Sequence, residues 1–236
     1  NFKSPKAQEK ILLETISNTQ NGKTATPTIQ REVLTLVSNL EQSSPMPQLA
    51  AILENDPQLI DGTWFLQYTS PSEVQTEDGD GDGNDDSGAS ASWTVQDAEE
   101  KITTKKFNAK GTLAAGGLTV DVSNRVPKQI FNLDQSTLMN EVLLDNGTMV
   151  NVGGSFRLSE KKVNRAVAGF TECKITLLGD GITLDLGFLF QILAVVRGTN
   201  DSGWLETTYL SENVRIGRGN KGTMFVLTRD SDAVKP

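Results

Sequence analysis

The 236-residue sequence contains no histidine and a single cysteine, Cys173. Without histidine the chain has no Ser-His-Asp or Cys-His relay, no imidazole base that titrates near neutral pH and no histidine-ligated zinc. One cysteine allows neither an internal disulfide nor a Cys-x-x-Cys motif. An enzyme of this composition would depend on carboxylates, lysine, tyrosine or serine, and no two of these stand at a spacing that indicates catalysis. We therefore expect a protein without catalytic activity, metal or cofactor.

Long hydrophobic runs and basic stripes are missing as well. The most apolar stretch, Phe188 to Val196, is far shorter than the ~18 apolar residues of a membrane-spanning helix, and it predicts one or two buried strands. No basic stripe indicates a nucleic-acid partner. The lysine run between Lys101 and Lys110 is interpreted as a solvated strand edge, with contact to anionic lipid head groups as the alternative.

The formal net charge of −8 comes from one segment of the chain. Seven of the 30 acidic residues lie between Glu73 and Asp86 with no basic residue among them, so the remaining 23 nearly balance the 22 basic ones. Residues 78–84 copy the first half of an EF-hand loop, but the twelfth position is Ala89 instead of glutamate. We predict a disordered, solvated insertion at residues 73–92, with a weak cation site as the alternative.

Residues 1–57 predict a helical segment. Ser4-Pro5 and Thr26-Pro27 each supply a helix-capping residue followed by a proline suited to the first helical position. A third short helix is expected over residues 48–54. We predict that this segment packs on a neighbouring sheet. Apolar residues of the second helix recur on one face: Ile29, Val33, Leu36, Val37 and Leu40.

From Thr63 onward the hydrophobic period changes to two, which predicts β-strands. Turn sequences such as Asn146-Gly147 favour hairpins between them. Many short strands with one apolar face indicate an antiparallel sheet or closed barrel of about 8 to 10 strands over residues 58–230, followed by a tail at 231–236. The candidate strands are residues 63–70, 118–123, 126–133, 137–144, 150–158, 163–177, 183–196, 204–210 and 224–229.

Residues 217–222 spell the dinucleotide fingerprint G-x-G-x-x-G. That motif binds a pyrophosphate only where a helix begins directly after it. Here a strand pattern follows at residues 223–228, so we interpret the glycines as a hairpin turn.

The predicted inward faces supply candidates for a ligand-binding interior. Arg165 is in phase with Val163 and Val167, and an inward arginine is costly unless it is paired. It either holds the polar head of a ligand, or lies at a barrel mouth or beside a bulge that shifts the phase. Cys173 is interpreted as a small buried apolar residue. The apolar candidates are Leu66, Tyr68, Val120, Val122, Val150, Val152 and Phe156.

Residues 203–229, GWLETTYLSENVRIGRGNKGTMFVLTR, resemble the C-terminal signature of the plastid lipid-associated protein (fibrillin) family. Residues 59–70, LIDGTWFLQYTS, are similar to an N-terminal element of the same family, and Gln129–Phe131 resembles its mid-chain Q-x-F element. The resemblance covers nearly the whole chain. The residues interpreted as its structural motif are Gly62, Trp64, Trp204, Tyr209, Arg215, Arg218, Gly219, Gly222 and Arg229.

The resemblance implies a lipocalin-like barrel that binds or sequesters carotenoids, quinones, chlorophyll-related pigments or lipids without catalysis. Its setting would be thylakoid or plastoglobule surfaces of a plastid, or cyanobacterial thylakoids. The alternative is a structural subunit that docks peripherally on a photosynthetic membrane complex or lipid droplet. In a lipocalin-like barrel Gly62-Thr63-Trp64 would place the Trp64 ring at the closed end, covered by Arg215 or Arg229 through a cation–π contact.

Overall fold

The computed structural model describes residues 4–43, 47–70, 112–115, 118–121, 125–144, 147–177, 182–185, 203–219 and 224–229. Several expectations lie outside these residues: the acidic insertion at 73–92, the lysine run, Val122, the apolar stretch 188–196, Gly222 and the tail.

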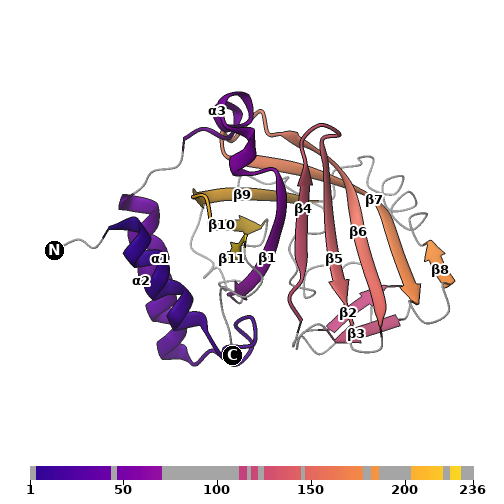
Figure 1. The fold of residues 1–236 in the computed structure, drawn as a ribbon, viewed down its shortest axis with the longest axis horizontal. Coiled ribbons are helices and arrows are strands. Elements are labelled where there is room, and N and C mark those ends of the chain that lie inside the picture. Colours follow the sequence, from indigo (N-terminus) through magenta and orange to yellow (C-terminus); the bar gives the residue numbers. More distant parts are fainter. Residues whose placement is uncertain are drawn as a thin grey trace, which may run out of the picture.

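The helices come first in the chain (Figure 1). Ser4 caps the first of them, since its side chain accepts a hydrogen bond from the Ala7 N–H at 3.4 Å. Thr26 does the same for the second, accepting from the Ile29 N–H at 3.3 Å. None of the described helices has the length and apolarity needed to cross a membrane. The helical elements are α1 (Pro5–Ile16), α2 (Pro27–Ser43), α3 (Leu49–Asn55) and the 3-10 turn η1 (Pro57–Leu59).

Strands make up the rest of the described chain. All their pairings are antiparallel. The strands are β1 (Gly62–Thr69), β2 (Thr112–Ala115), β3 (Leu118–Asp121), β4 (Lys128–Asn132), β5 (Thr137–Leu143), β6 (Thr148–Leu158), β7 (Arg165–Leu177), β8 (Ile182–Asp185), β9 (Gly203–Leu210), β10 (Val214–Gly219) and β11 (Met224–Thr228).

Nine of these strands form one sheet in the order β6-β5-β4-β1-β11-β10-β9-β7-β8, and an added pairing of β6 with β7 closes eight of them into a ring. β2 and β3 pair only with each other, as a separate two-stranded sheet. The predicted β-rich fold with a helical lead is therefore confirmed, with a barrel of eight strands. The interpretation of residues 217–222 as a hairpin turn is wrong for residues 217–219, which form the end of β10 and pair with β11; the next described residues, Met224–Thr228, are a strand.

The ring closes only along part of β7. Residues Arg165 to Ala168 pair with β9, whereas residues Lys174 to Leu177 pair with β8 instead. Figure 1 shows β7 and β8 running away from β9 beyond the closing pairs. We call the part of the barrel beyond them the splayed half; it comprises residues 140–143, 148–152, 173–177 and 182–185.

Two hydrophobic cores lie on opposite faces of the same strands. The interior cluster fills the barrel at the α3 end and contains Leu49, Ile60, Trp64, Leu66, Phe131, Leu138, Ala166, Ala168, Phe170, Leu205, Phe225 and Leu227. The helix-side cluster lies between α1, α2 and the outer face of β1, β9, β10 and β11. Its members are Leu12, Ile16, Val33, Val37, Leu40, Tyr68, Tyr209, Val214, Ile216, Met224 and Val226.

Candidate functional site

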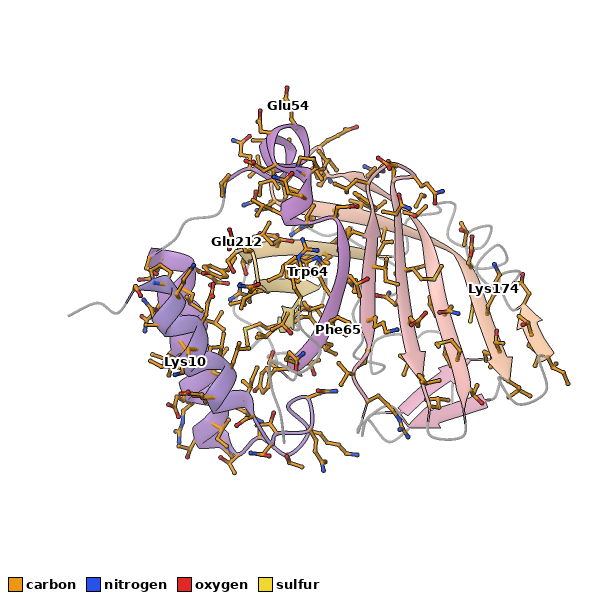
Figure 2. All side chains as sticks on the ribbon, viewed as in Figure 1. Lys10, Glu54, Trp64, Phe65, Lys174 and Glu212 are labelled. Atoms are coloured by element: carbon orange, nitrogen blue, oxygen red, sulfur yellow. The ribbon has the colours of Figure 1, made fainter. Side chains whose placement is uncertain are left out.

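Trp64 is the central buried side chain at the closed end of the barrel. Its ring is completely buried in the interior cluster, near the centre of the molecule in Figure 2, and its indole N–H donates to the Ile60 carbonyl at 2.8 Å. The Arg229 guanidinium carbon lies 4.2 Å from the ring centroid and that of Arg215 lies 5.3 Å from it. Arg229 also donates to the carbonyls of Asp61 and Gln58, so it ties β11 to the turn before β1.

Arg215 lies inside the barrel, because its neighbours across β11 and β1 are Leu227 and Leu66 of the interior cluster. Its side chain is fully buried. Burial, followed by the positive charge of Arg229, lowers the pKa of Arg215 to about 9. The group therefore still carries its charge at neutral pH.

A short polar layer crosses the interior at this level. Arg215 donates to Gln129 Oε1, and Gln129 Nε2 donates to Asn140 Oδ1 at 3.1 Å. All three side chains are at least nine-tenths buried. Neither Gln129 nor Asn140 was predicted as a site residue, although Gln129 alternates in phase with the buried Phe131. That phase is the signal that could have identified it.

Beyond the polar layer, the inner face of the splayed half is apolar apart from the buried Thr148 near the rim. Two rows of paired residues run across β5, β6 and β7, and their alternation places them on the interior side. At the rim, the residues that continue this face are exposed: Leu177 by 37%, Ile182 by 54% and Leu184 by 55%. The buried or half-buried members of the rows are Val142, Val150, Val152, Cys173 and Ile175.

Burial raises the pKa of the Cys173 thiol to about 11, with a further contribution from the charge of Asp185. The thiol is therefore protonated at neutral pH and behaves as an apolar part of the wall. Among the residues that the structure describes, no group of three His, Cys, Asp or Glu side chains gathers in a way that could hold a metal ion.

A pocket of about 400 Å³ lies at the opposite end, between α3, η1 and the β4–β5 turn. Phe156 lines it and meets the Phe131 ring edge-on at a centroid distance of 5.5 Å. Its rim carries the exposed Asp134 and Arg157. Of the predicted interior residues on β6, Phe156 and Val152 both pack against the interior cluster, whereas Val150 lies further along the strand.

Two of the predicted inward residues face outward instead. A bulge in β1 inserts Gln67 between Leu66, which opposes Leu227, and Tyr68, which opposes Val226. The extra residue reverses the phase, so Leu66 stays in the interior and Tyr68 belongs to the helix-side cluster.

Arg165 lies on the outer face of β7, because Ala166 and Ala168 occupy the interior face. It forms an ion pair with Glu206 at 2.9 Å and covers the Trp204 ring at 3.5 Å. Of the two interpretations left open for Arg165, the one in which it points inward and holds the head of a ligand is therefore wrong. Val120 lies in β3, in the separate two-stranded sheet.

The remaining motif residues attach the helices to the barrel. Tyr209 is buried under α1 and donates from its hydroxyl to Glu9 Oε1 at 2.6 Å. Arg218, on the outer face of β10, donates to both carboxylate oxygens of Glu41 in α2. Gly219 ends β10. The two carboxylates were not identified from the sequence; Glu9 shares a helix face with Leu12 and Ile16, which was the available signal.

Gly62 has a left-handed backbone, with φ +94°, and a Cβ there would lie 3.1 Å from Arg229 Nη1. A glycine allows both that backbone and the close passage of the guanidinium.

The architecture defines a class: an antiparallel barrel that closes along part of β7, with a helical cover on one side, a polar layer across its interior and a largely apolar splayed half. The chain belongs to the PAP_fibrillin family, which it matches over residues 6–79 and 128–228.

Curated relatives agree with this assignment. The chain is 29% identical over 235 residues to "Probable plastid-lipid-associated protein 3, chloroplastic" of Arabidopsis thaliana, covering 96% of this chain and 58% of that protein. It is 25% identical over 253 residues to "Plastoglobulin-1, chloroplastic" of Pisum sativum, covering 96% of this chain and 62% of the relative. A 118-residue stretch is 42% identical to "Probable plastid-lipid-associated protein 12, chloroplastic" of Arabidopsis thaliana, covering 45% and 29% of the two chains. The chain thus spans about six tenths of the first two relatives. No solved structure matches it.

Proposed function

We propose that the protein is a non-enzymatic, plastid lipid-associated barrel that binds or sequesters a hydrophobic small molecule at thylakoid or plastoglobule surfaces. The ligand class comprises carotenoids, quinones, chlorophyll-related pigments and lipids. Membership of the PAP_fibrillin family and the printed names of the relatives, which are plastid lipid-associated proteins and a plastoglobulin, support the lipid association and the plastid setting.

One observation carries the binding proposal: apart from Thr148, the inner face of the splayed half is apolar from the polar layer to its exposed rim. Val142 and Val150 are almost completely buried, whereas Leu177, Ile182 and Leu184 on the same face are exposed. An apolar ligand that buried a few hundred Å² against such a face would gain several kcal/mol at ~25 cal/mol/Å². The exposed rim also suits contact with a lipid surface, from which such a ligand would enter.

The test is saturable quenching of tryptophan fluorescence by β-carotene, a short-chain plastoquinone analogue and dodecanoate. Val150→Phe adds volume to the inner wall of the splayed half and should weaken binding at least tenfold. The matched control is Val163→Phe, because Val163 is 60% exposed outside the strands. Melting temperatures separate lost binding from lost folding. No saturable response to any of the three probes in the unaltered protein would refute the proposal.

A structural role is the second candidate, and a different observation favours it. The α3 end of the barrel is filled by large side chains, among them Trp64, Phe131 and Phe170, which leave that end packed as a core. A protein of this kind would dock peripherally on a photosynthetic membrane complex or lipid droplet. It would co-fractionate with that membrane, be released by salt or chaotrope without detergent, and show no response to the three probes.

A further inference from the structure

The interior of the barrel contains a positive charge that no described carboxylate neutralises. Arg215 is fully buried, and within the described residues its Nε and Nη1 atoms have no hydrogen-bond acceptor. An unpaired buried charge costs several kcal/mol. On the outer face, by contrast, Arg165 has Glu206 and Arg218 has Glu41.

The groups around Arg215 compensate its charge only in part. Gln129 accepts one hydrogen bond, and the Phe131 and Trp64 rings lie 4.7 and 5.3 Å from the guanidinium carbon. An amide and two aromatic rings contribute dipoles and quadrupoles but no net charge. The neighbouring Arg229 adds repulsion. Counted over the described residues, the interior therefore has two arginine nitrogens without an acceptor and one positive charge without a counter-ion.

The location of Arg215 connects this charge to the apolar wall. Gln129 opposes Asn140, Asn140 opposes Val152, and Val152 opposes Cys173, so the polar layer and the first apolar row share one level of the barrel. From that level, β7 continues for four residues to Leu177 at the exposed rim. At 3.2–3.4 Å per residue this path is about 13 Å long.

We infer that the barrel interior binds an apolar chain that ends in a carboxylate, with the carboxylate paired to Arg215 and the chain lying along the splayed half. This inference rests on the proposed binding function and narrows its ligand class. A carboxylate supplies both the missing charge and the oxygen acceptors, whereas a carbonyl or a hydroxyl supplies acceptors alone.

The experiment compares dodecanoate with dodecan-1-ol, which has the same chain without the charge, in competition against a fluorescent apolar probe. The unaltered protein should bind the acid at least tenfold more tightly than the alcohol. Arg215→Met should abolish that preference while alcohol binding persists. Arg218→Met is the matched control, because it removes the same charge from the outer face of the same strand and should leave the preference intact.

A second variant tests the inference while Arg215 stays in place. Gln129→Glu places a carboxylate where an oxygen already accepts from Arg215. We expect this internal counter-ion to raise the melting temperature and to bring the affinities for acid and alcohol to the same value. If Arg215→Met does not fold, Gln129→Glu decides the question alone.

The outcomes are distinguishable. Equal binding of acid and alcohol by the unaltered protein would overturn the inference while the proposed binding function stands. An acid preference that survives Gln129→Glu would overturn it as well, since the charge of Arg215 would then play no part. Absence of binding by both chains and by the fluorescent probe would reject the proposed function itself.

Discussion

Arginines contact the aromatic residues of this barrel in different electrostatic settings. Arg165 covers the Trp204 ring on the outer face with Glu206 beside it, at the half-exposed surface where such pairs contribute little to stability. Arg229 covers Trp64 at the closed end and donates to backbone carbonyls. Arg215 is inside, next to Trp64 and Phe131, without a carboxylate among the described residues. An arginine side chain therefore pairs with a carboxylate on the outer face, covers an aromatic ring at the closed end or places a positive charge in the interior, depending on how deeply it is buried.

The Tyr209–Glu9 hydrogen bond is the test at the scale of single residues. Tyr209→Phe should lower the free energy of unfolding by about 2 kcal/mol near pH 7, because it removes a buried hydrogen bond to a charged group and leaves Glu9 without it. Burial, then Glu9, raises the pKa of Tyr209. The stabilisation is therefore complete below pH ~10, where an unfolded-state tyrosine ionises, and is lost as the pH rises above that value. Urea unfolding at pH 7 and pH 11 should show the gap between the two proteins narrowing.

Tyr68→Phe is the control for this prediction. Tyr68 belongs to the same helix-side cluster, burial raises its pKa as well, and its hydroxyl meets no carboxylate in the part of the chain that the structure describes. Its loss should cost less than half as much. Equal costs for the two variants would mean that the hydrogen bond to Glu9 contributes nothing.

At the scale of strands, bulges decide which face a residue occupies. The alternation of apolar residues in the sequence was sufficient to locate β1, β5, β6 and β9 within a residue or two. It could not locate the extra residues Gln67 in β1 or Thr171 in β7, because a bulge is set by the fit to partner strands far along the chain. Tyr68 was therefore assigned to the interior and lies outside it. Arg165 was misplaced for a simpler reason: small alanines, instead of valines, fill the interior face of β7 there.

The β6 and β7 backbones approach each other closely at Gly154, which allows a test at the scale of strands. A Cβ at Gly154 would collide with the carbonyl oxygen of Gly169, which is backbone and cannot move aside. Gly154→Ala should therefore destabilise the protein by about 1–3 kcal/mol. At Gly153 the nearest atoms belong to the flexible end of Met139, at 2.7 and 2.8 Å. Gly153→Ala should cost clearly less in the same urea titration, and the opposite order would show that the strand spacing is not limited at Gly154.

At the scale of the molecule, the helices and the barrel interior pack on opposite faces of the same strands. The apolar stripe of α2 and the Ser4-Pro5 and Thr26-Pro27 pairs predicted the helices. The hydrophobic period of two predicted a sheet or barrel. Closure of the ring depends on β6 and β9 both pairing with β7, which is a long-range property that no local pattern encodes. The polar layer has this origin in part: Gln129 and Asn140 oppose each other in the local β4–β5 pairing, whereas Arg215 reaches Gln129 from β10, three strands away in the sheet order.

Because β1, β9 and β11 carry the interior cluster on one face and the helix-side cluster on the other, the two cores should unfold together. Leu40 of α2 is fully buried, so Leu40→Ala should cost about 2–5 kcal/mol. Leu34 on the same helix is 38% exposed, and Leu34→Ala serves as the control with a much smaller effect. Helical circular dichroism and tryptophan fluorescence, which includes Trp64 inside the barrel, should shift to a lower melting temperature by the same amount. A loss of helical signal ahead of the tryptophan signal would instead make the helices a separately folding cover, and the strands shared by both cores would not couple them.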